Sequence, residues 1–454
     1  MREPGDIHFA AKWAMMLSRV RSWRVVTATV GVALSAVLMS CTSDQAANGF
    51  ARLQGAPLVV LGAWSGSEQK QFEAVLHGFA QQTQASVTYV SAAHGVPAAL
   101  DRRFAAGDPP DVALLPQPGL LRNYAAARRL VPLDDATSSV VRRDYSPIWQ
   151  SLASADGTLY GVWFKAANKS LLWYNVGAFE RAGIAPPDEL SGLLPAARAI
   201  RASGVAPFSV GGEDQWTLTD WFENLYLQLA GAHDYDLLAA HEIAWTDPSV
   251  QTTLGYMAQL LAPQFLRGGV AGALDMNFQD SVTRAFSAPP GAAMVAEGDF
   301  VAGVITAQTK ARVGIDVDVA SFPAANRAVP AVVGGGDVAV QLRSSQAAAE
   351  LMRYLATPAA AAIWARAGGF ISANLELDLS VYPDDVTRSI ARSLLEAGAS
   401  FRFDLSDLQP TAFGSTPNTG MQGALRALLI SHDVPATARR LEVAAAAAYA
   451  ASPR

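Results

Sequence analysis

The sequence predicts an α/β protein of two lobes, and two observations carry this prediction. Between residues 57 and 115, short apolar runs alternate with stretches of helical spacing, in the order strand, helix, strand, helix, strand. This alternation is typical of a parallel sheet covered by helices. Beyond an N-terminal segment with a different pattern, roughly 400 residues remain, which is more than one hydrophobic core normally serves. We therefore expect two lobes or domains.

The first elements of this alternation can be placed individually. Pro57 to Trp64 is a continuous apolar run, typical of a strand buried on both faces. Ser67 is the predicted N-cap of the next helix, in which apolar residues recur with helical spacing from Phe72 to Phe79. The pattern continues with a strand at 85–90, a helix at 97–106, a turn at 108–111 and a strand at 112–115.

After residue 165 the alternation weakens and helices dominate. Helices are predicted at 190–202, 218–230, 249–261, 280–286, 346–355, 358–366 and 435–449, and strands at 292–295, 314–319 and 331–340. We find no internal repeat with a period of about 20 to 50 residues.

The N-terminal segment has the pattern of an export signal. Three arginines between residues 19 and 24 precede Val25 to Met39, which runs for 15 residues without a charge. That run is too short to span a bilayer as a helix, which needs about 20 apolar residues. Ser40 and Cys41 follow, and the segment resembles the lipobox of bacterial lipoproteins, whose cysteine is lipidated and becomes the new N-terminus. The alternative is a signal-anchor helix with a chance cysteine.

This resemblance implies a signal peptide at 1–40, and a lipidated Cys41 with a flexible tether at 41–55. The polar residues 42–48 fit a tether between lipid and domain. Cys41 is the only cysteine. Once it is lipidated, the exported part has no disulfide, no thiolate metal site and no cysteine nucleophile.

The composition excludes several classes of protein. The chain is 51% hydrophobic and 16% charged, with a net charge of −6, which excludes disorder and gives no support for nucleic-acid binding. The histidines form no zinc-like pair, and no Gly-x-Ser-x-Gly elbow is present. Paired carboxylates for glycoside cleavage stay open, because their separation cannot be read from sequence. We expect no catalytic residue, no metal and no cofactor.

Several sequence blocks, taken together, identify a family. They are the strand 58–64 with its helix, the turn 107–111, the blocks 157–162 and 172–175, the helix 179–184, and the blocks 291–299, 333–337 and 368–372 with Asn374. In this order, they resemble the extracellular solute-binding proteins of ABC importers, specifically the carbohydrate-binding group that includes maltose-binding protein. One departure is the direct run of Pro186-Pro187 into the next helix, without the family's usual Thr-Trp, which shortens a loop.

The resemblance implies the maltose-binding-protein-like (type II) periplasmic-binding-protein fold. Two α/β lobes are then joined by three crossovers, with the ligand in the cleft between them. Lobe 1 is expected at 56–165 and 338–370, and lobe 2 at 166–337 and 371–450. The crossovers are expected near 162–175, at 333–337 and at 368–372.

A sugar-binding cleft needs aromatic rings for the flat C–H faces and polar groups for the hydroxyls. In open α/β sheets such sites lie beyond the carboxyl ends of strands. The candidate ligand-binding residues are Trp64, Ser65, Glu68, Asp111, Trp216, Trp221, Glu297, Asp299, Gly336, Asp337 and Arg366. The glycines at 334–336 would let the backbone approach a ligand closely.

Each candidate also has a purely structural interpretation. Trp64 fits a core position equally well, and Glu68 fits a first-turn acid that stabilises its helix. Asp111 fits a turn. Glu297 and Asp299 fit caps of the next helix, and Arg366, like Lys165 and Asn168, fits a solvated surface.

The five-residue spacing of Trp216 and Trp221 puts at most one of them on the cleft. We choose Trp216, because it precedes the helix. Trp173, within a crossover strand, is expected to be buried.

The sequence thus predicts a lipid-anchored, monomeric receptor on the outer face of the cell membrane. It would bind an oligosaccharide or glycoside and deliver it to an ABC permease. The alternatives are the same fold with a glycerophosphodiester or a polyamine as ligand, a glycan-acting enzyme, and a sensory lectin.

Overall fold

The computed structural model describes residues 49–92, 95–325 and 331–451. The predicted signal peptide, Cys41 and most of the tether lie outside the described residues. Within the described part of the chain, no helix is both long and apolar enough to cross a membrane.

The first sheet has six strands and contains the parallel core that the sequence predicts. Its strands are β1 (Pro57–Gly62), β2 (Ser86–Ser91), β3 (Val112–Leu115), β6 (Gly161–Asn168), β11 (Val332–Gln341) and β12 (Phe401–Phe403). Strands β2, β1 and β3 are adjacent and parallel, with Val60 opposite both Tyr89 and Val112. The α/β class predicted from the alternation is confirmed.

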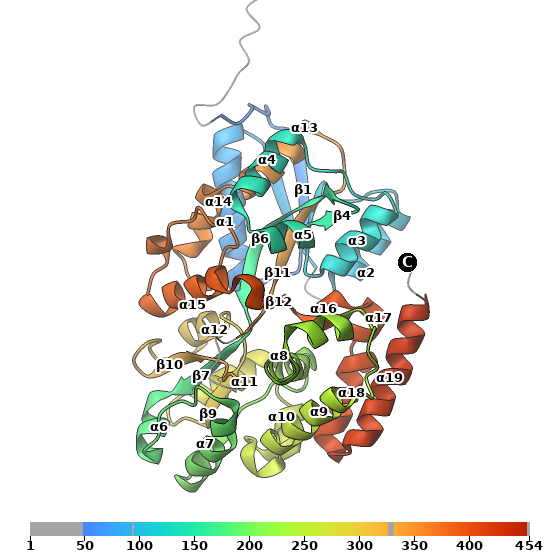
Figure 1. The fold of residues 1–454 in the computed structure, drawn as a ribbon. Helices are drawn as coiled ribbons and strands as arrows, with labels where there is room; N and C mark the ends of the chain where they lie inside the picture. Colours follow the sequence, from blue (N-terminus) through green and yellow to red (C-terminus); the bar gives the residue numbers. More distant parts are fainter. Residues whose placement is uncertain (1–48, 93–94, 326–330, 452–454) are drawn as a thin grey trace, which may run out of the picture. The chain divides into compact units, whose positions relative to one another are not determined.

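Strand β11 organises the rest of this sheet. Its carboxyl half runs antiparallel to β3, its amino end pairs in parallel with β12, and most of its length pairs antiparallel with β6. The register with β6 shifts between Asp337 and Val338. Because β11 and β6 both lead out of the first sheet towards the second, they form the connection between the lobes (Figure 1).

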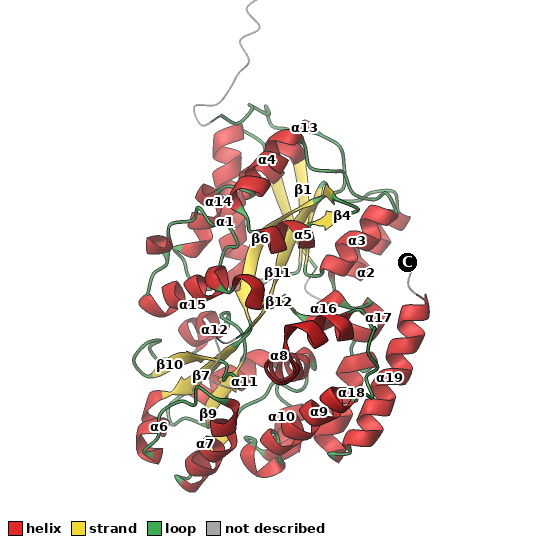
Figure 2. Ribbon diagram, viewed as in Figure 1, coloured by secondary structure: helices red, strands yellow, loops and turns green. Residues whose placement is uncertain are grey.

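The second sheet has four strands in the order β10, β7, β9, β8, and Figure 2 shows both sheets in yellow. Their bounds are β7 (Leu171–Asn175), β8 (Ala206–Phe208), β9 (Ala292–Ala296) and β10 (Val317–Ser321). Strand β7 follows β6 after Lys169 and Ser170 alone, so the first crossover is short. A separate two-stranded hairpin is formed by β4 (Ser154–Ala155) and β5 (Thr158–Leu159).

Helices cover both sheets. Those of the first half are α1 (Gly66–Thr83), α2 (Val96–Ala105), α3 (Pro118–Ala126), α4 (Asp135–Asp144), α5 (Pro147–Leu152), α6 (Val176–Ala182), α7 (Leu190–Ala202), α8 (Trp216–Ala239), α9 (Pro248–Leu260), α10 (Gly269–Leu274) and α11 (Phe278–Phe286). Those of the second half are α12 (Val301–Gln308), α13 (Gln346–Leu355), α14 (Pro358–Ala365), α15 (Asp385–Glu396), α16 (Leu405–Leu408), α17 (Thr411–Gly414), α18 (Gly420–Ser431) and α19 (Val434–Ala451). Helix α8 is kinked at Gly231, and α18 packs beside α19.

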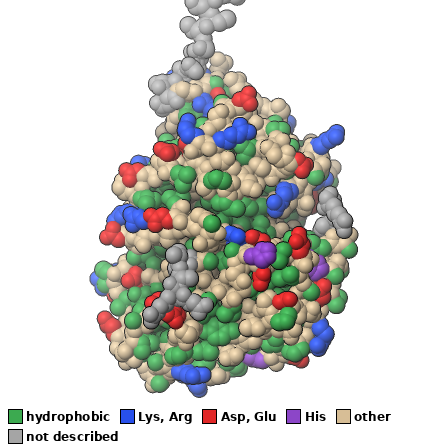
Figure 3. Space-filling view, in the orientation of Figure 1, with side chains coloured by type: hydrophobic (Ala, Val, Ile, Leu, Met, Phe, Trp, Pro, Cys, Tyr) green, Lys and Arg blue, Asp and Glu red, His purple; other side chains and the backbone are tan. Residues whose placement is uncertain are grey.

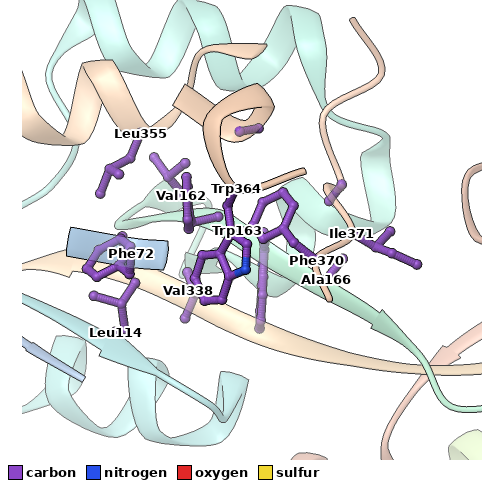
Figure 4. Packing of buried hydrophobic residues seen from close by; sticks show 14 of the residues in the cluster. Phe72, Leu114, Val162, Trp163, Ala166, Val338, Leu355, Trp364, Phe370 and Ile371 are labelled. Atoms are coloured by element: carbon purple, nitrogen blue, oxygen red, sulfur yellow. The ribbon is translucent and has the colours of Figure 1, made fainter. Parts of the chain in front are cut away.

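The core of the first sheet is dominated by aromatic rings. Figure 4 shows Phe72, Trp364 and Phe370 among the aliphatic residues of β3, β6 and β11. Trp364 stacks on Phe370 with ring centroids 5.2 Å apart. Fully burying one such side chain contributes about 1.5–3 kcal/mol, so this cluster fixes helix α14 and the following loop against the sheet.

Three local predictions differ from the structure. Ser67 lies inside α1, and Ser65 is the N-cap residue, without a side-chain capping bond. The strand predicted at 314–319 begins only at Val317, because Gly314 adopts a positive φ of 81° in the preceding turn.

The third difference concerns the last crossover, expected at 368–372. Ile371 pairs with Ala166 of β6, and α15 also contacts β6. The chain turns towards α8 only after β12, where α16 begins. The segment 371–400 therefore packs with the first sheet.

Candidate functional site

Two lysines on the first crossover mark the junction between the lobes. Lys165 lies near the end of β6, and Lys169 lies between β6 and β7. Their side chains are only 7% and 14% exposed, respectively. A buried ammonium requires a compensating negative charge. Each of the two lysines is paired with its own set of carboxylates.

Lys169 is held by two carboxylates of lobe 2. Its Nζ donates to Asp404 Oδ2 at 2.5 Å and to Asp220 Oδ1 at 3.1 Å, and both acids are 1% exposed. Burial lowers the pKa of an ammonium, but these two charges outweigh it and hold the pKa of Lys169 well above its usual value. The crossover is thereby fixed to the start of α8 and to the residue that precedes α16.

Asp220 and Asp404 belong to a larger group, the carboxyl cluster, formed with Glu223, Glu297 and Asp407. Glu223 accepts hydrogen bonds from the backbone N–H groups of Leu405 (2.9 Å) and Ser406 (3.1 Å). Asp220 Oδ2 and Glu297 Oε2 are buried and accept no hydrogen bond from an N–H or hydroxyl group of the other described residues. The two carboxyl groups bond to each other, and this bond raises the pKa of Glu297, so Glu297 donates to Asp220.

Burial sets the protonation of the carboxyl cluster. It raises the pKa of Asp220 to about 7, and it raises the pKa values of Glu223, Glu297 and Asp407 well above the usual range. Burial acts on Asp404 too, but the Lys169 charge and hydrogen bonds outweigh it and leave the pKa of Asp404 below its ordinary value. Asp404 is therefore the ionised partner of Lys169.

Three members of the carboxyl cluster could in principle hold a metal ion. One oxygen each from Asp220, Glu223 and Asp404 lie within 4.8 Å of one another. The Lys169 ammonium already bonds to two of these three residues. We therefore assign the balancing positive charge to Lys169 and not to a metal.

Lys165 has a corresponding group of acids from lobe 1 and the crossovers. Its Nζ donates to Glu68 Oε1 at 2.5 Å and lies 5.1 Å from the Trp364 ring. Burial raises the pKa of Asp337 to about 6, and the charge of Lys165 opposes this rise. Burial likewise raises the pKa of Asp299 to about 6, and Asp299 accepts a hydrogen bond from the Asn168 N–H at 2.8 Å.

Gly336 allows the two crossover strands to approach each other. Its φ is +155°, and a Cβ built there would lie 2.3 Å from the carbonyl oxygen of Lys165. No other residue type fits this backbone position without moving β6 or β11. The glycine thus serves the close crossing of the strands.

Three aromatic residues, the aromatic trio, lie beside the carboxyl cluster. Trp216, Phe278 and Phe300 are half-buried, with ring centroids 5.2 to 5.9 Å apart. Trp216 is the first residue of α8 and Phe278 the first of α11, whereas Phe300 directly precedes α12. The Asp214 carboxylate accepts a hydrogen bond from the Phe278 N–H at 2.6 Å, which ties two of these helix starts together.

The aromatic trio is adjacent to the charged groups. The Nζ of Lys169 lies 5.5 Å from the centre of the Trp216 ring, at the distance of a cation–π contact. An exposed ring next to buried hydrogen-bonding groups is the combination that saccharide faces and hydroxyls require. We assign the candidate ligand site to this part of the lobe junction.

The predicted candidates divide into two groups. Glu68, Trp216, Glu297, Asp299, Gly336 and Asp337 all lie at the junction. Trp64 is 5% exposed and packs edge-on against Phe72 in the core of lobe 1, while its indole N–H donates a hydrogen bond to Asp337 and its ring lies 5.9 Å from Lys165. Ser65 and Arg366 are exposed, at the start of α1 and the end of α14.

Two candidates lie away from this junction. Trp221 is 2% exposed and packs between Phe208 and Phe322, inside lobe 2. Asp111 precedes β3 and accepts a hydrogen bond from the Val59 N–H at 2.8 Å. Asp111 is therefore at the amino edge of the parallel strands, whereas the junction lies beyond their carboxyl ends.

The sequence reasoning included Glu68, the partner of Lys165, but missed the partners of Lys169 and part of the aromatic trio. Gln117, two residues after the end of β3, bonds to Asp407 across the junction at 3.0 Å. The rule that selects residues after strand ends would have found Gln117. No short-range signal marks Lys169 or Phe278, since their partners are distant in sequence.

Two features lie outside this junction. Small hollows of about 10 and 30 Å³ lie between α9 and α18 and beside Trp149, respectively. On the face shown in Figure 3, the Lys and Arg side chains of the described residues lie in separate small groups among acids. Such a surface is unlike the continuous basic face that nucleic acids require.

Comparison with known proteins identifies relatives of similar length. The osmoprotective compounds-binding protein GgtB of Synechocystis sp. is 32% identical over 366 residues, which are 79% of this chain and 86% of the relative. The alpha-glucosides-binding periplasmic protein AglE of Rhizobium meliloti is 32% identical over 381 residues, 80% of this chain and 82% of the relative.

Solved structures share the fold at lower identity. The bacterial solute receptor AcbH, described as preferring β-D-galactopyranose exclusively, superposes with a TM-score of 0.76 at 19% identity, over 87% of this chain and 99% of its own. RafE in complex with raffinose gives a TM-score of 0.70 at 17% identity, over 86% and 98%. The predicted two-lobed binding-protein fold is confirmed.

A family model described as bacterial extracellular solute-binding protein matches residues 63–362, most of the described chain. The curated relatives are named as binding proteins and not as enzymes, which removes the glycan-acting enzyme from the alternatives. The chain belongs to the family of bacterial extracellular solute-binding proteins, as its sequence blocks predicted.

Proposed function

We propose that this chain is the substrate-binding component of an ABC sugar importer, and that it binds an oligosaccharide or a glycoside between its lobes. The single observation that carries the proposal is the half-exposed aromatic trio next to the buried, mutually hydrogen-bonded carboxyl groups of Asp220 and Glu297. Aromatic faces bind the C–H surface of a sugar ring, and the carboxyl groups bind its hydroxyls. The name of AglE, an alpha-glucosides-binding protein, supports the same class.

The mechanism is closure of the two lobes around the ligand. A ligand shifts an open–closed equilibrium only by the difference between its affinities for the two states. Gln117 of lobe 1 already bonds to Asp407 on the other side of the junction. A sugar that contacts Trp216 in lobe 2 and Glu68 in lobe 1, or Asp337 on the crossover strand β11, stabilises the closed state, which the permease then recognises.

We also propose that the protein is attached to the cell membrane by a lipid on Cys41. The family is extracellular by its description. The charged-then-apolar leader that ends at Ser40 supports lipidation of Cys41 and anchoring to the outer face of the cell membrane. A lipid anchor keeps a monomeric receptor within reach of its permease.

Isothermal titration calorimetry of the purified protein tests the ligand class. The panel contains trehalose, maltose, sucrose, galactose and raffinose, with glycerophosphocholine and spermidine as the alternative solutes. Trp216→Ala is expected to weaken binding of the best sugar by about 1–3 kcal/mol, because a stacking surface is lost. Phe104→Ala, which truncates a half-buried ring on α2, is the matched control and leaves affinity unchanged.

Two results would contradict the proposal. Binding of glycerophosphocholine or spermidine without any sugar would keep the fold and replace the ligand class. Equal affinities of the Trp216→Ala variant and the unmodified protein would remove the aromatic trio from the site.

A further inference from the structure

Both cations at the lobe junction are already bound to carboxylates of the protein. Lys165 donates to Glu68, and Lys169 donates to Asp220 and Asp404. Arg366, two residues after the Trp364 ring that Lys165 approaches, is exposed. Hydration and salt weaken the attraction of exposed charges for an anion.

The backbone donors at the junction are also taken by carboxylates. The N–H groups of Leu405 and Ser406 bond to Glu223, and the N–H of Asn168 bonds to Asp299. At the start of α1, where a helix terminus favours negative charge, the first turn already contains Glu68. An anionic ligand would have to displace an acid of the protein to reach these donors.

The remaining polar groups of the junction are carboxyl groups. Asp220 and Glu297 are 1% and 3% exposed and bond to each other, and their oxygens accept from no N–H or hydroxyl group of the other described residues. Hydroxyl groups can donate to such oxygens or accept from their protonated form. A phosphate or a carboxylate offers acceptors alone and brings a negative charge that neither Lys165 nor Lys169 is free to balance, which is strongly unfavourable in a buried site.

We infer that the site selects uncharged saccharides and rejects their anionic forms, such as sugar phosphates and uronic acids, because Lys165 and Lys169 are committed to protein carboxylates. This inference rests on the proposed function and names its substrate class. It also separates this chain from a receptor for glycerophosphodiesters, which would need an uncommitted cation for its phosphate.

Calorimetry with matched pairs tests the inference. The pairs are trehalose with trehalose 6-phosphate, sucrose with sucrose 6-phosphate, and glucose with both glucose 6-phosphate and glucuronate. We expect the neutral member of a binding pair to bind at least about a hundredfold more tightly than its anionic counterpart, as for a like charge brought within a few ångströms in a partly buried site. Equal affinities within a pair would overturn the inference and leave the proposed function intact. If none of the sugars binds, whether neutral or anionic, both the inference and the proposed function are refuted.

A variant tests whether the pairing of the lysines is the cause. Glu68→Gln removes the hydrogen-bonded charge partner of Lys165 at a half-exposed position that the fold tolerates. We expect the neutral-to-anionic affinity ratio to fall by about tenfold, since one buried ammonium becomes available to the ligand. Glu73→Gln makes the same change on the exposed face of the same helix and leaves the ratio unaltered.

An unchanged ratio in Glu68→Gln would contradict the assigned cause. Asp337→Asn removes a second of the three acids whose charges act on Lys165, the third being Asp299, and repeats the test independently. If both variants retain the full ratio, the commitment of Lys165 does not determine the selectivity, and the inference is overturned.

Discussion

Replacing Lys169 by methionine should destabilise the protein by an amount that depends on pH. The change keeps most of the side chain's length and removes the ammonium that bonds to Asp404 at 2.5 Å and to Asp220 at 3.1 Å. Removing one partner of a buried ion pair typically costs about 3–5 kcal/mol. Asp404 is the residue most affected by the loss of Lys169, because the charge and hydrogen bond of Lys169 keep its pKa below the ordinary value.

Protonation of Asp404 limits how much stability the Lys169→Met variant loses. Without Lys169, the buried Asp404 can avoid its charge by taking up a proton, which costs about 1.4 kcal/mol for each pH unit above an ordinary pKa near 3.9. That limit is about 5–6 kcal/mol at pH 8 and about 1.5 kcal/mol at pH 5. In the unmodified protein, the lowered pKa of Asp404 contributes stability above the unfolded pKa, and this contribution is lost on acidification. The difference between the two proteins should therefore shrink as the pH falls.

Urea unfolding at both pH values measures this difference. We expect a loss of about 3–5 kcal/mol at pH 8 and about 1.5 kcal/mol or less at pH 5. Lys70→Met, which removes an exposed lysine on α1, is the control and should change the free energy of unfolding by less than about 0.5 kcal/mol. A loss of the same size at both pH values would refute the reasoning, since it would mean that Lys169 does not balance a titrating acid.

Two further predictions concern the crossing of the strands and the anchor. Gly336→Ala should destabilise the protein by about 3 kcal/mol or more, because the new Cβ meets the Lys165 carbonyl. Gly335→Ala is the control and should cost much less, because its Cβ meets only the flexible Lys169 side chain. Equal midpoints of urea unfolding for the two variants would contradict this prediction. Cys41→Ser should move the exported protein from the membrane fraction to the soluble fraction, while Thr42→Ser should not. Retention of the serine variant in the membrane would instead favour a signal-anchor helix.

The strands that could be predicted are those buried on both faces by their own apolar residues. Leu58 to Leu61 and Val112 to Leu115 are continuous apolar runs, and both are strands. Strand β6 has no such pattern, because Lys165 and Asn168 interrupt it. These polar side chains are buried only because acids and hydroxyls from distant segments receive them, and no local pattern contains that information.

The candidate site was predictable to a similar extent. The spacing of Trp216 and Trp221 predicted that at most one of them faces the cleft, and the structure buries Trp221 in the core. The acids after β9 were found because they follow a strand. The pairing of Lys169 with Asp404 could not be found, because it joins segments more than two hundred residues apart in the chain.

The topology of β11 has a consequence for how the chain must fold. Its antiparallel pairing brings Val338 opposite Leu115, and its parallel pairing brings Val332 opposite Phe401. The first sheet is therefore incomplete until the ribosome has made almost the entire chain. Pairings between such distant segments form slowly, because the chain entropy of closing long loops must be overcome first. A protein with this connectivity stays unfolded for longer after synthesis, in the state in which a polypeptide can be threaded through a narrow export channel.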